Sequence, residues 1–162
     1  MGYYLGFVFQ KGMKDRLSRL ERAVSYLESF LDVLKRIEVL EKGEITEYER
    51  YLELDTWCIL NSREQETHKK PDAAVIREEK IRRLRVEKET NHRLEEIKFL
   101  EEKKEKGGVV DEDLEREKWI LALQSCSRKA LNDLRMIPQE IEILQYMKTM
   151  QDAGKDLHQE VV

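Results

Sequence analysis

Between residues 14 and 41, apolar side chains recur at alternating intervals of three and four positions. This spacing predicts a helix that packs one face against the rest of the protein. Gly43 is a candidate C-cap for this helix. The sequence Thr46-Glu47-Tyr48-Glu49 then has the form of a capping box, which predicts a second helix that continues to about Leu60. The apolar positions of the first helix are Leu17, Leu20, Val24, Leu27, Leu31 and Leu34, widened by Phe30, Ile37 and Leu40.

The first nine residues are apolar and contain the aromatic residues Tyr3, Tyr4, Phe7 and Phe9. We expect this segment to pack on the helix over 14–41, so that residues 1–60 form a set of N-terminal helices. A binding patch, or a surface for self-association, is the alternative. The segment lacks the basic start of a signal peptide and the Ser or Thr that N-myristoylation requires at position six. A cytoplasmic protein is therefore expected.

Residues 61–71 contain no apolar side chain and end in Pro71, which predicts a linker or a long loop. Asp72 suits an N-cap, and nothing interrupts the chain before Gly107, so a helix over 72–106 is expected, about 52 Å long. Charged residues fill 21 of its 35 positions. We expect its N-terminal half to project and its C-terminal half to pack. Ion pairs one turn apart should support it, namely Glu78–Arg82, Glu79–Arg83 and Glu89–Arg93.

After Gly108, we expect a region of C-terminal helices over 109–152. Asp111 should cap the first helix, and Pro138 should kink or restart it. A short Gly-containing loop should make the helix over 72–106 and the helix over 111–135 an antiparallel hairpin. Residues 153–162 are expected to be a frayed tail. The inner face of these helices is predicted to contain Leu114, Ile120, Leu121, Leu131 and Leu134, and then Ile141, Leu144, Met147 and Met150.

Composition narrows the class of protein. The chain has 162 residues, of which 40 % are charged, with only 7 Gly and 2 Pro. An all-β fold needs many turns, so the small number of Gly and Pro residues argues against it. No stretch approaches the 18 apolar residues that a membrane-spanning helix needs, which argues against a membrane protein. The net charge of −4 argues against nucleic-acid binding, which normally needs a basic excess. An all-α fold of antiparallel helical hairpins, in one domain over 1–162, is expected.

No arrangement of catalytic, metal-binding or cofactor-binding residues emerges from the sequence. His68, His92 and His158 lie on the linker, an exposed helix and the tail, and no metal-ligand or phosphate-loop motif is present. The protein is therefore not expected to be an enzyme. Cys58 and Cys126 are expected to be buried thiols in a reducing compartment. The residues Trp57 and Trp119 lie on helical stripes and are expected to anchor the core.

One stretch of the long helix carries a local basic excess. Seven basic and four acidic residues lie between Arg77 and Arg93, a charge of +3 in an acidic protein. At 100° per residue, Arg77, Lys80, Leu84 and Lys88 fall within about 80° of each other on one side. Such a strip suits docking on an acidic protein surface. A merely solvated helix face is the alternative.

The sequence also resembles a known family in an ordered series across three helices. The matching segments are Arg77-Glu-Glu-Lys80-Ile81-Arg-Arg83-Leu-Arg85 with Lys88-Glu89 and His92-Arg93-Leu94, then Asp111-Glu-Asp-Leu-Glu-Arg116, Trp119-Ile-Leu121 and Gln139-Glu-Ile-Glu-Ile-Leu144. This series resembles the alpha-four/Tap-forty-two family of type 2A protein phosphatase regulators. The resemblance is carried mainly by residues 70–150, with a fainter one from Leu17 onward. The first helices of the family would precede Met1, and its acidic tail would follow Val162.

The resemblance implies a TPR-like, non-catalytic adaptor. It would bind the catalytic subunit of type 2A or related phosphatases, in TOR-linked signalling and phosphatase stabilisation. The family's contact pair, an Arg and a Lys three residues apart, falls on Arg77 and Lys80. With the neighbouring strip, the predicted phosphatase-binding residues are Arg77, Lys80, Arg83, Leu84 and Lys88. A helical scaffold or coiled-coil adaptor for an unrelated protein is the alternative function.

Overall fold

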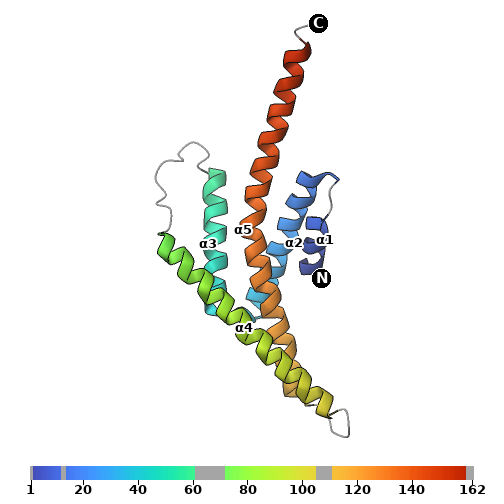
Figure 1. The fold of residues 1–162 in the computed structure, drawn as a ribbon, viewed down its shortest axis with the longest axis vertical. Helices are drawn as coiled ribbons and strands as arrows, with labels where there is room; N and C mark the ends of the chain where they lie inside the picture. The colour runs from blue at the N-terminus through green and yellow to red at the C-terminus, as the bar shows by residue number, and fades with distance from the viewer. Residues whose placement is uncertain (1, 12–13, 61–71, 105–110, 160–162) are drawn as a thin grey trace. The chain divides into compact units, whose positions relative to one another are not determined.

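A computed structural model describes residues 2–11, 14–60, 72–104 and 111–159, with side chains described except over 54–60 and 155–159. These residues form five α-helices and no strand, which confirms the all-α prediction (Figure 1). The predicted linker over 61–71 and the side chains of Trp57 and Cys58 lie outside the described residues. The helices are α1 (Gly2–Lys11), α2 (Arg16–Arg36), α3 (Lys42–Leu60), α4 (Ala73–Lys104) and α5 (Glu112–Gln159).

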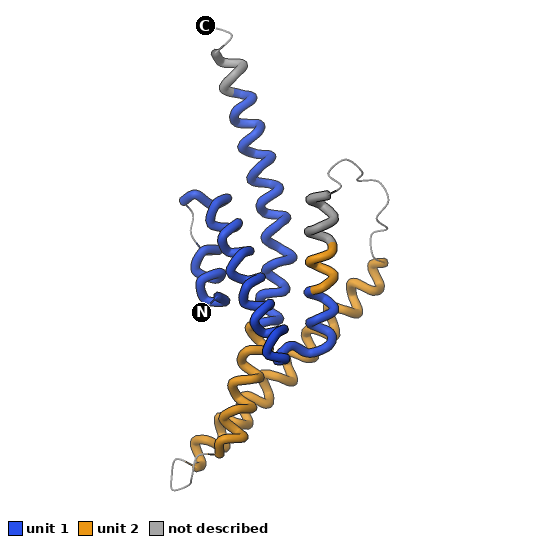
Figure 2. Tube along the Cα trace, turned by 180° about the vertical axis from the view of Figure 1, so that it is seen from behind, with its two compact units in different colours: residues 1–48, 127–162 blue, residues 49–126 orange. Residues whose placement is uncertain are grey.

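The chain divides into two compact units (Figure 2). Unit 1 comprises residues 1–48 and 127–162, and unit 2 comprises residues 49–126. Both α3 and α5 run from one unit into the other. The single domain and the TPR-like arrangement therefore stay predictions.

The core of unit 1 is built on α2. Most of the predicted apolar seam is buried, and α1 packs on it through its inner face. The ring of Phe9 stacks on Tyr26 with centroids 5.4 Å apart, and the ring of Tyr3 lies 5.6 Å from that of Phe30. This confirms the expected packing of the N-terminal segment. The buried apolar residues of unit 1 are Leu20, Ala23, Leu27, Leu31, Leu34, Leu40, Tyr48, Ala130, Leu131, Leu134 and Ile137.

The predicted boundary between α2 and α3 is wrong. α2 ends at Arg36, and the chain turns through Glu38, whose φ is 58°. Gly43 is not a C-cap, because it lies in the first turn of α3. The backbone N–H of Glu41 donates to the carboxylate of Glu44 at 3.1 Å. This contact is half of a capping box, placed before the predicted one at Thr46.

The C-terminal prediction is also corrected. α5 is one helix that continues through Pro138 to Gln159, so no restart occurs and residues 153–159 are helical. Leu134 and Ile137 are buried next to Pro138, and their packing favours an unbroken helix despite the backbone hydrogen bond that proline removes. Cys126 is half-buried rather than buried.

Parts of the predicted inner face of α5 are exposed. Trp119 does not anchor the core, because its side chain is 60 % exposed, and Met147 and Met150 are exposed as well. Trp119 lies two residues after Glu117, which pairs with α4, and two residues correspond to about 200° around a helix. The indole therefore points away from the α4–α5 contact.

Candidate protein-docking site on α4

The start of α4 is fixed by Asp72, as predicted. The Asp72 carboxylate accepts a hydrogen bond from the backbone N–H of Ala74 at 3.3 Å. The Asp72 carbonyl accepts the first backbone hydrogen bond of the helix, from Ile76 at 3.1 Å. Asp72 is therefore the N-cap of α4.

Ion pairs hold the C-terminal half of α4 against the start of α5. Arg93 donates two hydrogen bonds to Glu117, at 2.7 and 2.9 Å. This hydrogen-bonded pairing raises the pKa of Arg93 and lowers the pKa of Glu117. Further along, Lys118 pairs with Glu101 at 2.9 Å, and Lys104 pairs with Asp111 at 3.2 Å. These pairs confirm the predicted antiparallel hairpin, which Figure 2 shows within unit 2.

The local ion pairs of α4 follow the prediction only in part. Glu79–Arg83 forms, at 3.4 Å. Arg93 pairs with Glu117 and Glu96 instead of with Glu89. In the described part of the chain, no ion pair joins Glu78 to Arg82. Tertiary partners on α5 thus replace one local pair, because a bidentate contact with a carboxylate is stronger.

The first half of α4 is exposed, and it contains the predicted strip. We define the α4 strip as Arg77, Lys80, Leu84 and Lys88, which share one side of the helix. All four side chains are exposed, and that of Leu84 is 59 % exposed. Within the described residues, Arg77, Lys80 and Lys88 have no ion-pair partner. Three cations and an apolar residue are therefore open to a partner protein.

Arg83 differs from the other predicted residues. It lies about 120° around the helix from Arg77, and its side chain is half-buried. Its guanidinium donates to Glu79, which also accepts a hydrogen bond from Arg50 of α3 at 3.3 Å. The structure therefore places Arg83 in an ion-pair network at the edge of the α4 strip.

Two apolar residues belong beside the strip but were missing from the predicted set. Ile76 and Ile81 are exposed, and Ile81 lies only about 40° around the helix from Arg77. The helical period already indicates this position. The exposed surface is therefore more apolar than the charges alone predict.

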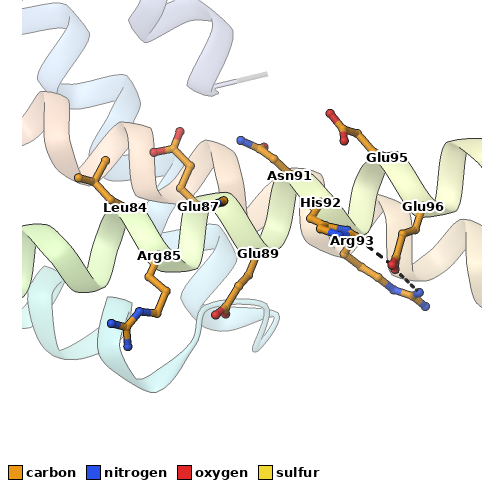
Figure 3. Close-up of a pocket in the computed structure, with 10 residues that line it drawn as sticks. Leu84, Arg85, Glu87, Glu89, Asn91, His92, Arg93, Glu95 and Glu96 are labelled. Atoms are coloured by element: carbon orange, nitrogen blue, oxygen red, sulfur yellow. Dashed lines mark hydrogen bonds and ion pairs between the residues drawn. The ribbon is translucent and has the colours of Figure 1, made fainter.

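The strip continues into a shallow hollow along residues 84–96 of α4, which Leu84 and Lys88 help to line. Figure 3 shows its labelled side chains projecting from this single helix in several directions. His92 and Arg93 both contact Glu96, at 3.5 and 3.1 Å. Across the described residues, no group of three or more His, Cys, Asp or Glu side chains could hold a metal ion. Because all the residues that line the hollow belong to α4, it is an open surface of one helix.

The described residues form an all-helical protein that exposes a basic and apolar strip on α4. The sequence model of the TAP42-like family matches residues 1–161, and the chain therefore belongs to the TAP42-like family. The match includes the N-terminal helices, beyond the residues 70–150 that mainly carry the resemblance. Comparisons with curated proteins and with solved structures give no match. In the part of the chain that the structure describes, no helix is long and apolar enough to cross a membrane.

Proposed function

We propose that this protein is a non-catalytic adaptor that binds the catalytic subunit of a type 2A or related protein phosphatase. Membership of the TAP42-like family and the resemblance of its helices to phosphatase regulators support this assignment. We further propose that the adaptor acts in the cytoplasm, in TOR-linked signalling, and that it stabilises the phosphatase subunit.

The proposal rests on the exposure of the basic side chains of the α4 strip and on their lack of ion-pair partners within the described residues. Arg77, Lys80 and Lys88 are exposed, and no carboxylate within the described residues pairs with them. Other cations of the same helix are already engaged, such as Arg93 with Glu117 and Lys104 with Asp111. The strip can therefore form charge-assisted contacts with carboxylates of a partner without breaking contacts inside unit 2.

The apolar residues add a second element of recognition. Leu84 and Ile81 lie among the cations and are exposed. A partner that presents carboxylates around an apolar patch would bury these side chains while it pairs with Arg77 and Lys80. An acidic surface without such a patch would leave them in water, so the strip selects for both features.

The direct test is a double charge reversal, Arg77→Glu with Lys80→Asp, followed by measurement of the affinity for a purified type 2A catalytic subunit. We expect the affinity to fall by about 10- to 100-fold, because two attractive contacts become repulsive. A matched control is Arg82→Glu with Lys103→Asp, which changes the same charge at exposed positions of α4 on other sides of the helix than the strip. The control should bind like the wild type.

The outcomes separate the site from the function. Unchanged affinity of the Arg77/Lys80 variant, with helical content intact by circular dichroism, would remove the strip as the docking site. Failure of the wild type to bind any type 2A catalytic subunit would contradict the proposed function. In that case a scaffold for an unrelated protein would become the better assignment.

A further inference from the structure

The C-terminal half of α5, in unit 1, has an apolar face that nothing within the described residues covers. We define the α5 stripe as five residues that are each 52–63 % exposed. The members of the α5 stripe are Met136, Ile143, Tyr146, Met147 and Met150.

The stripe has the spacing of a coiled-coil seam. Met136, Ile143 and Met150 are seven residues apart, and Tyr146 and Met147 follow Ile143 by three and four. The five residues fall within about 100° on one side of α5. Leu134, which is buried in unit 1, lies about 180° around the helix from Ile143. The stripe is therefore a second apolar side of α5, distinct from the side that forms the core.

The stripe is also free of charge. From Met136 to Gly154, the positions within this sector are 136, 139, 143, 146, 147, 150 and 154, and none is charged. The nearest charged position is Glu140, about 20° outside the sector, which pairs with Arg16. Because 40 % of the chain is charged, about three charges would be expected among seven positions. In a symmetric pair the same stripe forms both sides of the contact, so any charged residue in it would enter the interface twice with the same sign. A partner selected by charge would find no counter-charge here.

We propose that the α5 stripe is a self-association surface, which pairs with the α5 stripe of a second copy of this chain as a short coiled coil. The small residue Gly154 fits this arrangement. It lies within α5, where glycine costs helix stability, and a Cβ added there would meet no atom within 4 Å. An approaching helix could come close to the backbone of α5 at this position.

The exposed area sets the strength of the pairing. Five side chains of roughly 200 Å², each a little more than half exposed, offer about 600 Å² per copy, or about 1,200 Å² per pair. This is the lower limit for specific interfaces. Three of the five residues are methionines, which pack with less precision than branched side chains. The dimer should therefore be weak and dependent on concentration.

The rival surface for self-association is the outer side of α1, where Tyr4 and Val8 are exposed. That side is less uniform, because the ammonium of Lys11 lies 4.5 Å from the ring of Phe7. In a symmetric contact through this side, the ammonium group would enter the interface twice. The uncharged α5 stripe is the better match for a second copy.

Sedimentation velocity of the whole chain over about 5 to 200 µM tests the proposal. We expect the mass of the wild type to rise from 19.4 kDa towards twice that value. The variant Ile143→Glu with Met150→Glu should stay monomeric throughout. The control variant Gln145→Glu with Thr149→Glu adds the same charge at exposed positions outside the stripe, and it should dimerise like the wild type.

A third variant, Tyr4→Glu with Val8→Glu, distinguishes the two surfaces and should leave the dimer intact. Circular dichroism of each variant verifies that helical content is retained. A wild type that stays monomeric at all concentrations would overturn the proposal and leave the stripe for a different protein. A dimer that survives the Ile143/Met150 substitutions, or that only the α1 variant abolishes, would overturn it equally.

Discussion

Two carboxylates of unit 1 have pKa values that move in opposite directions. Glu44 is buried, and burial raises its pKa although Arg128 lies 3.2 Å away and the Glu41 N–H donates to it. The carboxylate of Glu140 is half-exposed and accepts hydrogen bonds from the Arg16 guanidinium at 2.6 and 2.9 Å. These hydrogen bonds lower the pKa of Glu140. Burial outweighs pairing at the first residue, and pairing outweighs desolvation at the second.

The substitutions Glu44→Gln and Glu140→Gln should therefore give opposite pH trends. Because the folded pKa of Glu44 lies above the ordinary value of 4.5, the wild type loses stability relative to Glu44→Gln as the pH rises above that value. Because the folded pKa of Glu140 lies below 4.5, the stability that Glu140 contributes is present above 4.5 and is lost as the pH falls through the folded pKa.

Urea unfolding of the wild type and both variants between about pH 3.5 and pH 7 measures these differences in the free energy of unfolding. Each variant is the control for the other, since both replace a glutamate by an isosteric neutral amide. Differences that change with pH in the same direction would contradict the assignment.

At the scale of the helices, the contact between α1 and α2 depends on one close approach. A Cβ placed on Gly6 would lie 2.8 Å from the Cγ and Cδ2 atoms of Leu27, which is fully buried. Because protein interiors are densely packed, a fully buried Leu27 can move only by displacing its neighbours. Gly6 therefore permits the distance at which α1 packs.

We expect Gly6→Val to lower the free energy of unfolding by about 1–3 kcal/mol, because it overpacks this contact. Gly154→Val places the same side chain in open space on α5, and it should change the stability by no more than about 0.5 kcal/mol. Chemical denaturation of both variants at about 1 µM, where the chain should be monomeric, tests the comparison without a contribution from pairing of the α5 stripes. Equal effects at the two positions would show that helix propensity, rather than the α1–α2 contact, determines the result.

The helices and the strip could be predicted from the sequence because their signals are local. The three-and-four spacing located the buried residues of α2, and Asp72 located the start of α4. The common side of Arg77, Lys80, Leu84 and Lys88 follows from the helical period alone. Local signals also misled, since Gly43 suggested a C-cap that the Glu41–Glu44 contact overrides.

Other features depend on contacts between distant residues, which periodicity does not specify. The exposure of Trp119 follows from the register that Arg93 and Glu117 set, 24 residues apart in the chain. The pair of Arg83 with Glu79 is local and was predicted, whereas the second contact of Glu79, with Arg50 of α3, joins residues 29 apart in the chain and was not. Apolar spacing also predicted a continuous inner face for α5, although Met147 and Met150 are exposed.

At the scale of the whole molecule, the chain carries two exposed surfaces of unlike chemistry. The α4 strip belongs to unit 2 and is cationic, although the net charge of the chain is −4. The α5 stripe belongs to unit 1 and is uncharged. Binding of a partner through ion pairs and binding of a second copy through apolar contacts should therefore depend differently on salt concentration.

Salt should separate the two interactions within one preparation of the protein. Raising sodium chloride from about 50 to 500 mM shortens the screening length well below 10 Å, so binding of the phosphatase subunit should weaken on the order of tenfold. Self-association through the α5 stripe should be unchanged or stronger, because burial of apolar surface is not screened by salt.

Affinity measurements and sedimentation velocity at both salt concentrations provide the comparison. Salt should no longer weaken phosphatase binding by the Arg77→Glu with Lys80→Asp variant, because it also screens the repulsion that this variant introduces. The Ile143→Glu with Met150→Glu variant should keep the salt dependence of the wild type. A parallel loss of both interactions with salt would contradict the assignment of one charged and one apolar surface.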